Sequence, residues 1–365
     1  VLAEGRPIVL LSWNVQLGLG TRETAFYSDE LFPEERGEAE DMIHRLHDIA
    51  EVIGEQKPDI VLLQEVDFDS RRSHRVDQHA RLSEALGSAC HTSIPIDQGN
   101  PEEHLGRISR QVSMGLSSFT QRRASQATGV PLDRPSLGDK TPWSMLTTQM
   151  PVAVHLPENA EERTEVLQGP MNTNTYLQVV NVHLTGAHLG KGRMSYQVQR
   201  IREWIDSLPE NQPWILAGSF DLLPASDHPA RLSLEEDTRN RSQKGYVSRA
   251  NPYLGMPNPL EILYEHYQEA FQDSEDPAPY TYKPSDLLAA DRKIDHVFHG
   301  GPVKILEATV LREFPHLSNH LPIRIEFSLF EGRNIQTADR PLQRLEQSAS
   351  DNEESIPENP APETP

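Results

Sequence analysis

The sequence predicts a layered α/β protein, in which helices cover sheets of buried strands. Aliphatic runs of strand length recur along the chain, and turn-forming or polar residues bound each of them. The runs at 8–14 and 60–67 enclose a segment, 38–55, whose apolar residues repeat with helical spacing. A strand, a helix and a second strand in succession are typical of this class. Because the runs are continuous rather than alternating, we expect both faces of the sheets to be covered.

The remaining elements follow from the same patterns in chain order. Helices are expected at 38–55, 76–86, 194–208 and 260–271, and strands at 8–14, 60–67, 113–119, 143–156, 177–184, 214–224, 293–298, 303–311 and 322–330. Two long polar segments, 120–142 and 225–260, show no clear periodicity. Loops of this length in a compact domain are usually functional or mobile.

Composition sets limits on the kind of protein. Of the 365 residues, 36% are hydrophobic and 6% aromatic, which is enough for a substantial core. We expect one domain over residues 1–334 and an acidic, disordered tail over 335–365, where the chain becomes polar. The formal net charge of −21 disfavours non-specific binding to a phosphate backbone, unless a basic cleft or a metal ion offsets it.

The compartment is weakly determined. Cys90 is the only cysteine, so no disulfide within the chain is possible, which slightly favours the cytoplasm. No run approaches the roughly 18 apolar residues of a transmembrane helix. We take the protein to be a monomer without a membrane span.

Polar side chains stand at or near the ends of five of the expected strands. Where the ends of neighbouring strands meet at one edge, such groups form an active-site constellation. The residues concerned are Asn14, Glu65, His183, Ser219 with Asp221, and Asp295.

Six short motifs, in order, resemble the signature of the endonuclease/exonuclease/phosphatase superfamily, which has a DNase I-like fold. They are SWN (12–14), QEV (64–66), NVHL (181–184), GSFD (218–221), KIDHVF (293–298) and SNHLPI (318–323). Abasic-site endonucleases, sphingomyelinases and inositol-polyphosphate 5-phosphatases share this fold. The resemblance covers residues 8–330 and implies a four-layer αββα sandwich with two mixed β-sheets.

The resemblance also implies a metal site. It gives Glu65 the role of ligand to Mg²⁺ or Mn²⁺, and Asn14 that of helping to position metal and phosphate. A hard divalent ion of this kind is usually held by one or two carboxylates, with water and substrate phosphate completing its shell. The bland alternatives are a solvated carboxylate at a strand end and a turn-forming asparagine.

Two histidines are implied to act on the scissile phosphate. An imidazole can donate to a phosphoryl oxygen or serve as acid or base. The family pattern places His183 and His320 there, with Asp295 holding His320 in its charged orientation. His188, His299 and His316 match no motif and are expected at the surface. A zinc site at His44 and His47 is disfavoured, because no third ligand is evident.

Two motifs depart from the family pattern. Gly-Asp-Phe-Asn has become Gly-Ser-Phe-Asp, and Ser-Asp-His has become Ser-Asn-His, so Ser219 and Asn319 stand where the family has Asp. A serine cannot replace the general base, whose loss costs about 10²–10⁴-fold. Asn319 still suits substrate binding but lacks a charge for the metal. Because side chains alternate along a strand, Asp221 is expected to face the same cavity as Ser219.

The implied function is a Mg²⁺-dependent phosphoester hydrolase, of phosphodiesterase, nuclease or phosphatase type, with an altered active site. The alternative is a weakened or inactive relative that binds phosphorylated ligands or a protein partner. Whether Ser219 and Asn319 are natural or introduced stays open, as does a scaffold that uses the acidic tail. The substrate is expected to be a phosphorylated small molecule or a nucleic acid. Both long segments are expected to flank the site. Their basic residues suit phosphate recognition, with an ordinary solvated loop as the alternative: Arg122, Arg123, Arg134, Lys140, Arg239, Arg241, Lys244 and Arg249.

Overall fold

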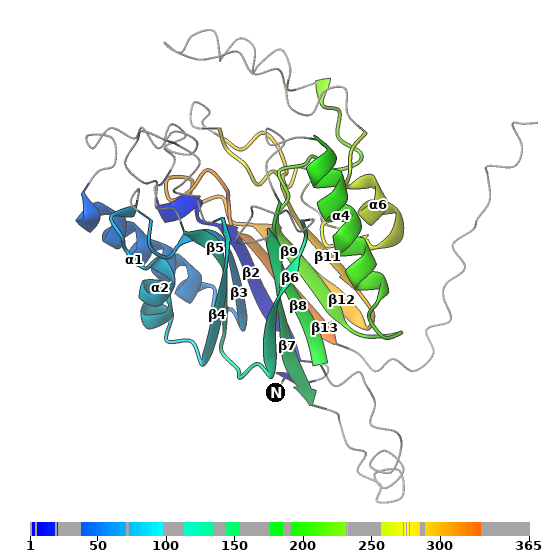
Figure 1. Ribbon diagram of the computed structural model, residues 1–365, viewed down its shortest axis with the longest axis horizontal. Coiled ribbons are helices and arrows are strands. Elements are labelled where there is room, and N and C mark those ends of the chain that lie inside the picture. The colour runs from blue at the N-terminus through cyan, green and yellow to red at the C-terminus, as the bar shows by residue number, and fades with distance from the viewer. Residues whose placement is uncertain are drawn as a thin grey trace, which may run out of the picture. The chain divides into compact units, whose positions relative to one another are not determined.

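The computed structural model of the chain shows two β-sheets with helices outside them (Figure 1). The structure describes residues 2–3, 6–18, 20, 38–70, 73–97, 113–133, 143–153, 176–184, 191–230, 232, 257–272, 274, 276, 278–284 and 289–329. They belong to one compact unit, Val1–Glu331. The tail predicted over 335–365 lies outside the described residues, so its disorder stays a prediction.

The first sheet has six described strands in the order β12-β13-β2-β3-β5-β4. Its centre is the parallel pair of β2 and β3, and the other neighbours are antiparallel. The strands are β2 (Ile8–Asn14), β3 (Ile60–Asp67), β4 (Cys90–Asp97), β5 (Met114–Thr120), β12 (Val303–Val310) and β13 (Ile323–Leu329). Every residue of β3 is buried, as expected of a central strand covered on both faces.

The second sheet runs β1-β7-β8-β9-β11-β10, and β6 pairs with β7. Its central pair, β8 and β9, is also parallel, whereas β11 runs antiparallel to β9. The strands are β1 (Leu2–Ala3), β6 (Gln126–Pro131), β7 (Ser144–Ala153), β8 (Tyr176–His183), β9 (Trp214–Ser219), β10 (Gln268–Glu269) and β11 (Asp295–Gly300). A side chain at Gly218 would meet the Val182 carbonyl oxygen at 1.8 Å, so β8 and β9 approach each other closely there.

Helices cover the outer face of each sheet, which gives four layers. Figure 1 shows α1 (Ala39–Glu55) and α2 (Gln78–Leu86) beside the first sheet, and α4 (Lys191–Asp206) and α6 (Glu261–His266) beside the second. A capping box between Glu38 and Asp41 begins α1, and the Asp77 side chain caps α2. None of the described helices is long and apolar enough to span a membrane.

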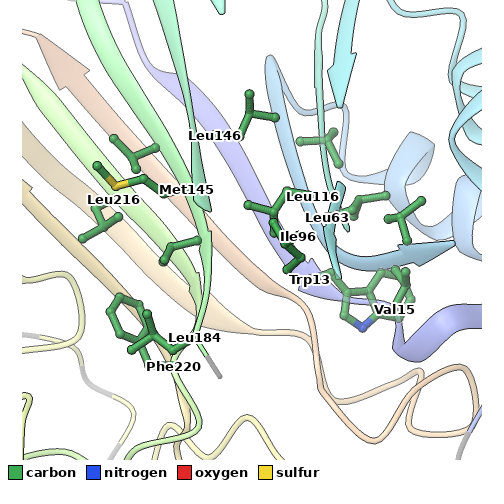
Figure 2. Packing of buried hydrophobic residues seen from close by; sticks show 14 of the residues in the cluster. Trp13, Val15, Leu63, Ile96, Leu116, Met145, Leu146, Leu184, Leu216 and Phe220 are labelled. Atoms are coloured by element: carbon green, nitrogen blue, oxygen red, sulfur yellow. The ribbon is translucent and has the colours of Figure 1, made fainter. Parts of the chain in front are cut away.

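The space between the two sheets has an aliphatic region and a polar region. Its lower part is aliphatic and includes Leu10, Leu62, Val179 and Ala217. Nearer the carboxyl ends of the same strands the inward residues are polar, and Gln64 donates to Asn181 at 2.7 Å across the sheets. The side chains that alternate with these point outward. Figure 2 shows several of them, including Trp13, Leu63 and Leu216, in the cluster under the helices.

The structure confirms the four-layer αββα sandwich with two mixed sheets and corrects several elements. Residues 126–131 of the segment expected to be a loop form β6, and β4 was not expected. The helix expected at 260–271 ends at His266, because Gln268 and Glu269 pair with β11. The strand that begins at Trp214 ends at Ser219, and the residues beyond it form a turn.

Candidate active site

The predicted site residues meet at one edge of the two sheets. Across the second sheet, His183 of β8, Ser219 of β9 and Asp295 of β11 lie side by side in register. The expectation that Asp295 ends its strand is wrong, since it begins β11. His320 likewise precedes its strand, β13. Because β11 and β13 run antiparallel to β9 and β2, their starting ends reach the same edge.

Glu65 is held in place by the backbone and by Asn14. It lies at a register shift of β3 and has φ of +55°, a conformation that non-glycine residues rarely adopt outside constrained sites. Asn14 Nδ2 donates to Glu65 Oε1 at 2.8 Å, and Asn14 Oδ1 accepts from the backbone N–H of Gln16 at 3.0 Å. Asn14 therefore orients the carboxylate, whereas direct metal ligation by Asn14 stays a prediction.

His320 and Asp295 form a buried pair. His320 Nδ1 lies 3.0 and 2.9 Å from the two Asp295 carboxylate oxygens. Burial lowers the pKa of His320, but the charge and hydrogen bond of Asp295, with the charges of Glu65 and Asp221, outweigh burial and raise it to about 9. His320 is therefore an imidazolium at neutral pH, with Nδ1–H facing Asp295.

Hydrogen bonds to Asn14, Trp13 and Gln16 hold the segment that carries His320. Ser318 Oγ donates to the Asn14 carbonyl at 2.7 Å and accepts the backbone N–H of His320 at 3.1 Å. Trp13 Nε1 donates to the His320 carbonyl at 2.8 Å. The backbone N–H of Asn319 donates to Gln16 Oε1 at 2.8 Å. These bonds tie the segment to β2 and to η1 (Gln16–Gly18), so the His320 ring has little freedom.

Asp221 is partly buried beside this pair. It follows the end of β9 and has φ of +53°, so strand alternation does not explain its place, contrary to the expectation. Burial raises its pKa; the His320 charge opposes this and the Asp295 charge adds to it, leaving a value of about 6. Asp221 thus lies within electrostatic reach of both residues and is mostly ionised at pH 7.

His183 faces Glu65 and is neutral. Its Nε2 lies 3.5 Å from Glu65 Oε1. Burial, and then the charge of His320, lower the pKa of His183 to about 3, against a smaller opposing effect of the Ser219 backbone. Trp143 Nε1 donates to the His183 carbonyl, and the two rings lie 5.7 Å apart. Trp143 therefore holds the backbone of His183 and lies beside its ring.

Several buried polar atoms at this edge lack a hydrogen-bond partner among the described residues. They are Ser219 Oγ and both amide atoms of Asn319. Buried polar groups are normally paired, so these atoms indicate room for a bound polar species. A carboxylate at Glu65 and an amide oxygen at Asn319 are hard ligands of the kind that Mg²⁺ and Mn²⁺ accept. The residues present therefore fit a divalent ion whose remaining ligands are water and substrate.

Comparison with known proteins decides the family. A model of the endonuclease/exonuclease/phosphatase family matches residues 11–320, most of the chain. The chain belongs to this family. Membership suggests phosphoesterase or nuclease activity.

Solved structures agree on the fold. A family member from Beutenbergia cavernae superposes with a TM-score of 0.59 at 19% identity, covering 90% of this chain and 72% of that one. A member from Bacteroides vulgatus gives 0.54 at 15% identity, covering 89% and 100%. A mannosyl-6-phosphatase from Bacteroides thetaiotaomicron gives 0.52 at 15% identity, covering 88% and 100%. At these identities the likeness concerns the fold alone. The search of curated proteins gave no match.

Not all the basic residues singled out in the sequence lie at the candidate active site. Arg122 lies 4.0 Å from Asp59, just before β3, which is the end of that strand opposite Glu65. The prediction that it flanks the site is therefore wrong. The remaining part of the segment returns along β6 to Asp133, near Trp143. Six other candidates lie outside the described residues: Arg134, Lys140, Arg239, Arg241, Lys244 and Arg249.

The other histidines singled out in the sequence lie away from this site or outside the described residues. His299 is buried, and burial lowers its pKa to about 4, so the prediction of a surface position is wrong. His316 is exposed as expected, and His188 lies outside the described residues. On α1, His47 brings its ring nitrogen within 4.8 Å of carboxylate oxygens of Asp48 and Glu51, all exposed. His44 is not among them, and exposed acidic groups commonly gather without an ion.

Sequence patterns missed several residues that hold the family site together. Thr281 Oγ1 accepts the backbone N–H groups of Ile294 and Asp295, each at 3.1 Å. The Thr281 carbonyl accepts the N–H of Leu321, so this residue links the two halves of the His320–Asp295 pair. Gln16 and Trp143 were also missed. Gln16 stands two residues beyond the SWN motif, which was the one available signal; Trp143 and Thr281 act through partners distant in sequence.

Proposed function

We propose that this chain is a Mg²⁺- or Mn²⁺-dependent phosphoester hydrolase in which Asp221 accepts the proton of the attacking water. The observation that carries the proposal is the position of Asp221 beside the His320–Asp295 pair, with a pKa of about 6. A general base works best with a pKa near the operating pH. Asp221 thus supplies the carboxylate that Ser219 does not.

The other residues divide the remaining work. His320, kept charged by Asp295, donates to a phosphoryl oxygen, where charge accumulates in the transition state. Neutral His183 and the amide of Asn319 orient the phosphate. Glu65, oriented by Asn14, holds the metal ion. When bound, such an ion neutralises charge on the phosphoryl oxygens and lowers the pKa of a bound water.

The substrate class is proposed more broadly. A phosphorylated small molecule or a nucleic acid held at a local patch fits an acidic chain of net charge −21 better than non-specific backbone binding does. The likeness to a mannosyl-6-phosphatase and membership of the endonuclease/exonuclease/phosphatase family both fit an ester of phosphate, without choosing between mono- and diesters.

The test is turnover of bis(p-nitrophenyl) phosphate, p-nitrophenyl phosphate, sugar phosphates, abasic DNA and RNA, with Mg²⁺ or Mn²⁺ titrated. Asp221→Asn is expected to lower kcat about 10²–10⁴-fold while leaving the fold intact. Glu65→Gln is expected to raise the metal concentration needed for half-maximal rate. If no substrate is turned over at any metal concentration, the hydrolase proposal fails.

A second candidate function is a relative that binds phosphorylated ligands without turnover. The unpartnered atoms of Ser219 and Asn319 support it, because a binding site needs polar groups aimed at the ligand but no base. Inorganic phosphate binding measured by calorimetry, together with no turnover in either the native chain or a variant carrying Asp at both positions, would favour this candidate over the hydrolase.

A further inference from the structure

The turn that carries Asp221 needs support from its surroundings. Its φ of +53° is a backbone conformation that non-glycine residues hold only where neighbouring contacts impose it. The turn lies beyond the last ladder pair of β9, so strand pairing does not supply those contacts. Phe220, just before Asp221, donates its N–H to the Ile294 carbonyl at 2.9 Å. The support after Asp221 comes from elsewhere.

His296 and Tyr264 hold the first carbonyl after Asp221. His296 Nε2 lies 2.8 Å from the Leu222 carbonyl oxygen, and Tyr264 Oη lies 2.9 Å from His296 Nδ1. A carbonyl only accepts, so Nε2 carries the proton and Nδ1 accepts from the tyrosine hydroxyl. Burial lowers the pKa of His296 and raises that of Tyr264, which keeps the ring neutral and the hydroxyl protonated. The direction of both bonds is therefore fixed.

Asn258 holds the next carbonyl. Its Nδ2 donates to the Leu223 carbonyl at 2.8 Å, and its Oδ1 accepts the N–H of Leu260 at 3.0 Å. Asn258 lies three residues before Glu261, where α6 begins, and Tyr264 lies within the helix. Asn258 thus binds the Leu223 carbonyl directly, and Tyr264 supports the Leu222 carbonyl through His296. Asn258 and Tyr264 belong to one short stretch of chain.

Aromatic packing completes the contact. The Phe220 ring meets His296 edge-on, with centroids 5.4 Å apart and an interplanar angle of 87°. Tyr264 packs in the same manner on Phe298, at 5.1 Å. The side chain before Asp221 and the carbonyl after it therefore rest on the same imidazole, which leaves the turn little room to relax.

We propose that Asn258, Tyr264 of α6 and His296 of β11 form a clamp that positions the Asp221 carboxylate for catalysis. The clamp residues touch neither substrate nor metal in this proposal; they act through the backbone of the turn. The inference rests on the proposed role of Asp221, and the experiment below separates a failure of the clamp from a failure of that role.

The experiment uses two matched pairs of variants in the full chain. Tyr264→Phe removes the hydroxyl that binds His296, whereas Tyr267→Phe removes a hydroxyl that donates to Asp206 at 2.7 Å, one residue beyond α6. His296→Leu removes the donor to the Leu222 carbonyl, whereas His296→Gln replaces it with an amide N–H. Each variant is measured for kcat and KM on bis(p-nitrophenyl) phosphate with Mg²⁺, for thermal stability, and for the pKa of Asp221 by carboxyl ¹³C NMR.

The clamp predicts a kcat about tenfold lower or more for His296→Leu, since displacements of about 1 Å at a reacting group can cost 10²-fold. KM should change little. The Asp221 carboxyl should become more hydrated, so its pKa should fall from about 6 toward its ordinary value. His296→Gln should stay within about threefold of the native kcat, and Tyr264→Phe should fall between the two. Tyr267→Phe should match the native chain in kcat and in the pKa of Asp221.

Two results would overturn the clamp. The first is a loss of thermal stability in His296→Leu and Tyr264→Phe with kcat and the pKa of Asp221 unchanged. The second is an equal effect of Tyr264→Phe and Tyr267→Phe. If His296→Leu does not fold, the tyrosine pair carries the test alone. If Asp221→Asn retains full activity, the role of Asp221 fails, while the NMR titration still decides whether the clamp positions its carboxyl.

Discussion

Replacing Asp295 by Asn should remove the electrostatic stabilisation that keeps His320 protonated in the folded state. The two carboxylate oxygens of Asp295 lie 3.0 and 2.9 Å from His320 Nδ1, and Asn keeps the shape but removes the charge. His320 has a pKa of about 9 in the folded protein, against about 6.5 when unfolded. At about 1.4 kcal/mol per pKa unit, this difference corresponds to roughly 3 kcal/mol of native-state stabilisation.

The pH dependence follows from the sign of that shift. A folded-state pKa above the unfolded value means that the folded state binds the proton more tightly. The stabilisation is therefore fully present below about pH 6.5 and is lost as the pH rises through about 9. In Asp295→Asn the burial that lowers the pKa of His320 loses its main counterweight, so His320 should be neutral at pH 7. The variant should be less stable than the native chain by up to about 3 kcal/mol at pH 6, with the gap closing by pH 9.

The assay combines urea unfolding at several pH values with a long-range ¹H–¹⁵N NMR titration of His320. Asp276→Asn is the matched control, because Asp276 pairs with Arg312 at 2.5 Å and a guanidinium does not titrate in this range. The control should lose little stability and show no new dependence between pH 6 and 9. If His320 still titrates near pH 9 in Asp295→Asn, the electrostatic account of this pair is refuted.

Two further predictions concern the same edge of the sheets. Restoring Asp at both Ser219 and Asn319 should lower the Mg²⁺ concentration for half-maximal rate by about tenfold or more, since two carboxylates are added to a buried site; a metal titration with no shift would contradict this. Trp143→Phe removes the donor to the His183 carbonyl and should lower kcat several-fold while costing about 1–3 kcal/mol in urea unfolding; unchanged kcat would show that the bond serves stability alone.

The sequence predicted best the elements whose signal is local. Strands β2 and β3 are continuous aliphatic runs and are buried as such, and Glu65 was found because it lies near the carboxyl end of β3. Edge strands carry no such signal. In β6, Gln126 and most of its neighbours are exposed and pair only with β7, so their polar composition is typical of a loop.

The sequence predicted some contacts of the site but not the way in which other residues reach it. The His320–Asp295 pair was expected from motif order, and the structure places the two side chains in contact. Asp221 was expected to reach the site by strand alternation, but it gets there through a left-handed backbone conformation that the letters GSFD do not encode. His296 is hidden within a strand motif, because its role depends on Tyr264, 32 residues earlier in the chain.

The exchange of carboxylates changes the charge of the site less than the two lost aspartates suggest. Ser219 and Asn319 each remove a negative charge relative to the family pattern, but Asp221 stands where that pattern has Asn and returns one. A single net charge less has opposite effects on the two ligands: it weakens attraction for a divalent cation and weakens repulsion of a phosphate anion. Relative to a site with the family's aspartates, this chain should therefore need a higher metal concentration for half-maximal rate, while its KM for a phosphate substrate at saturating metal should be the same or lower. If both quantities are higher in this chain, the substitutions damage phosphate binding as well as metal binding.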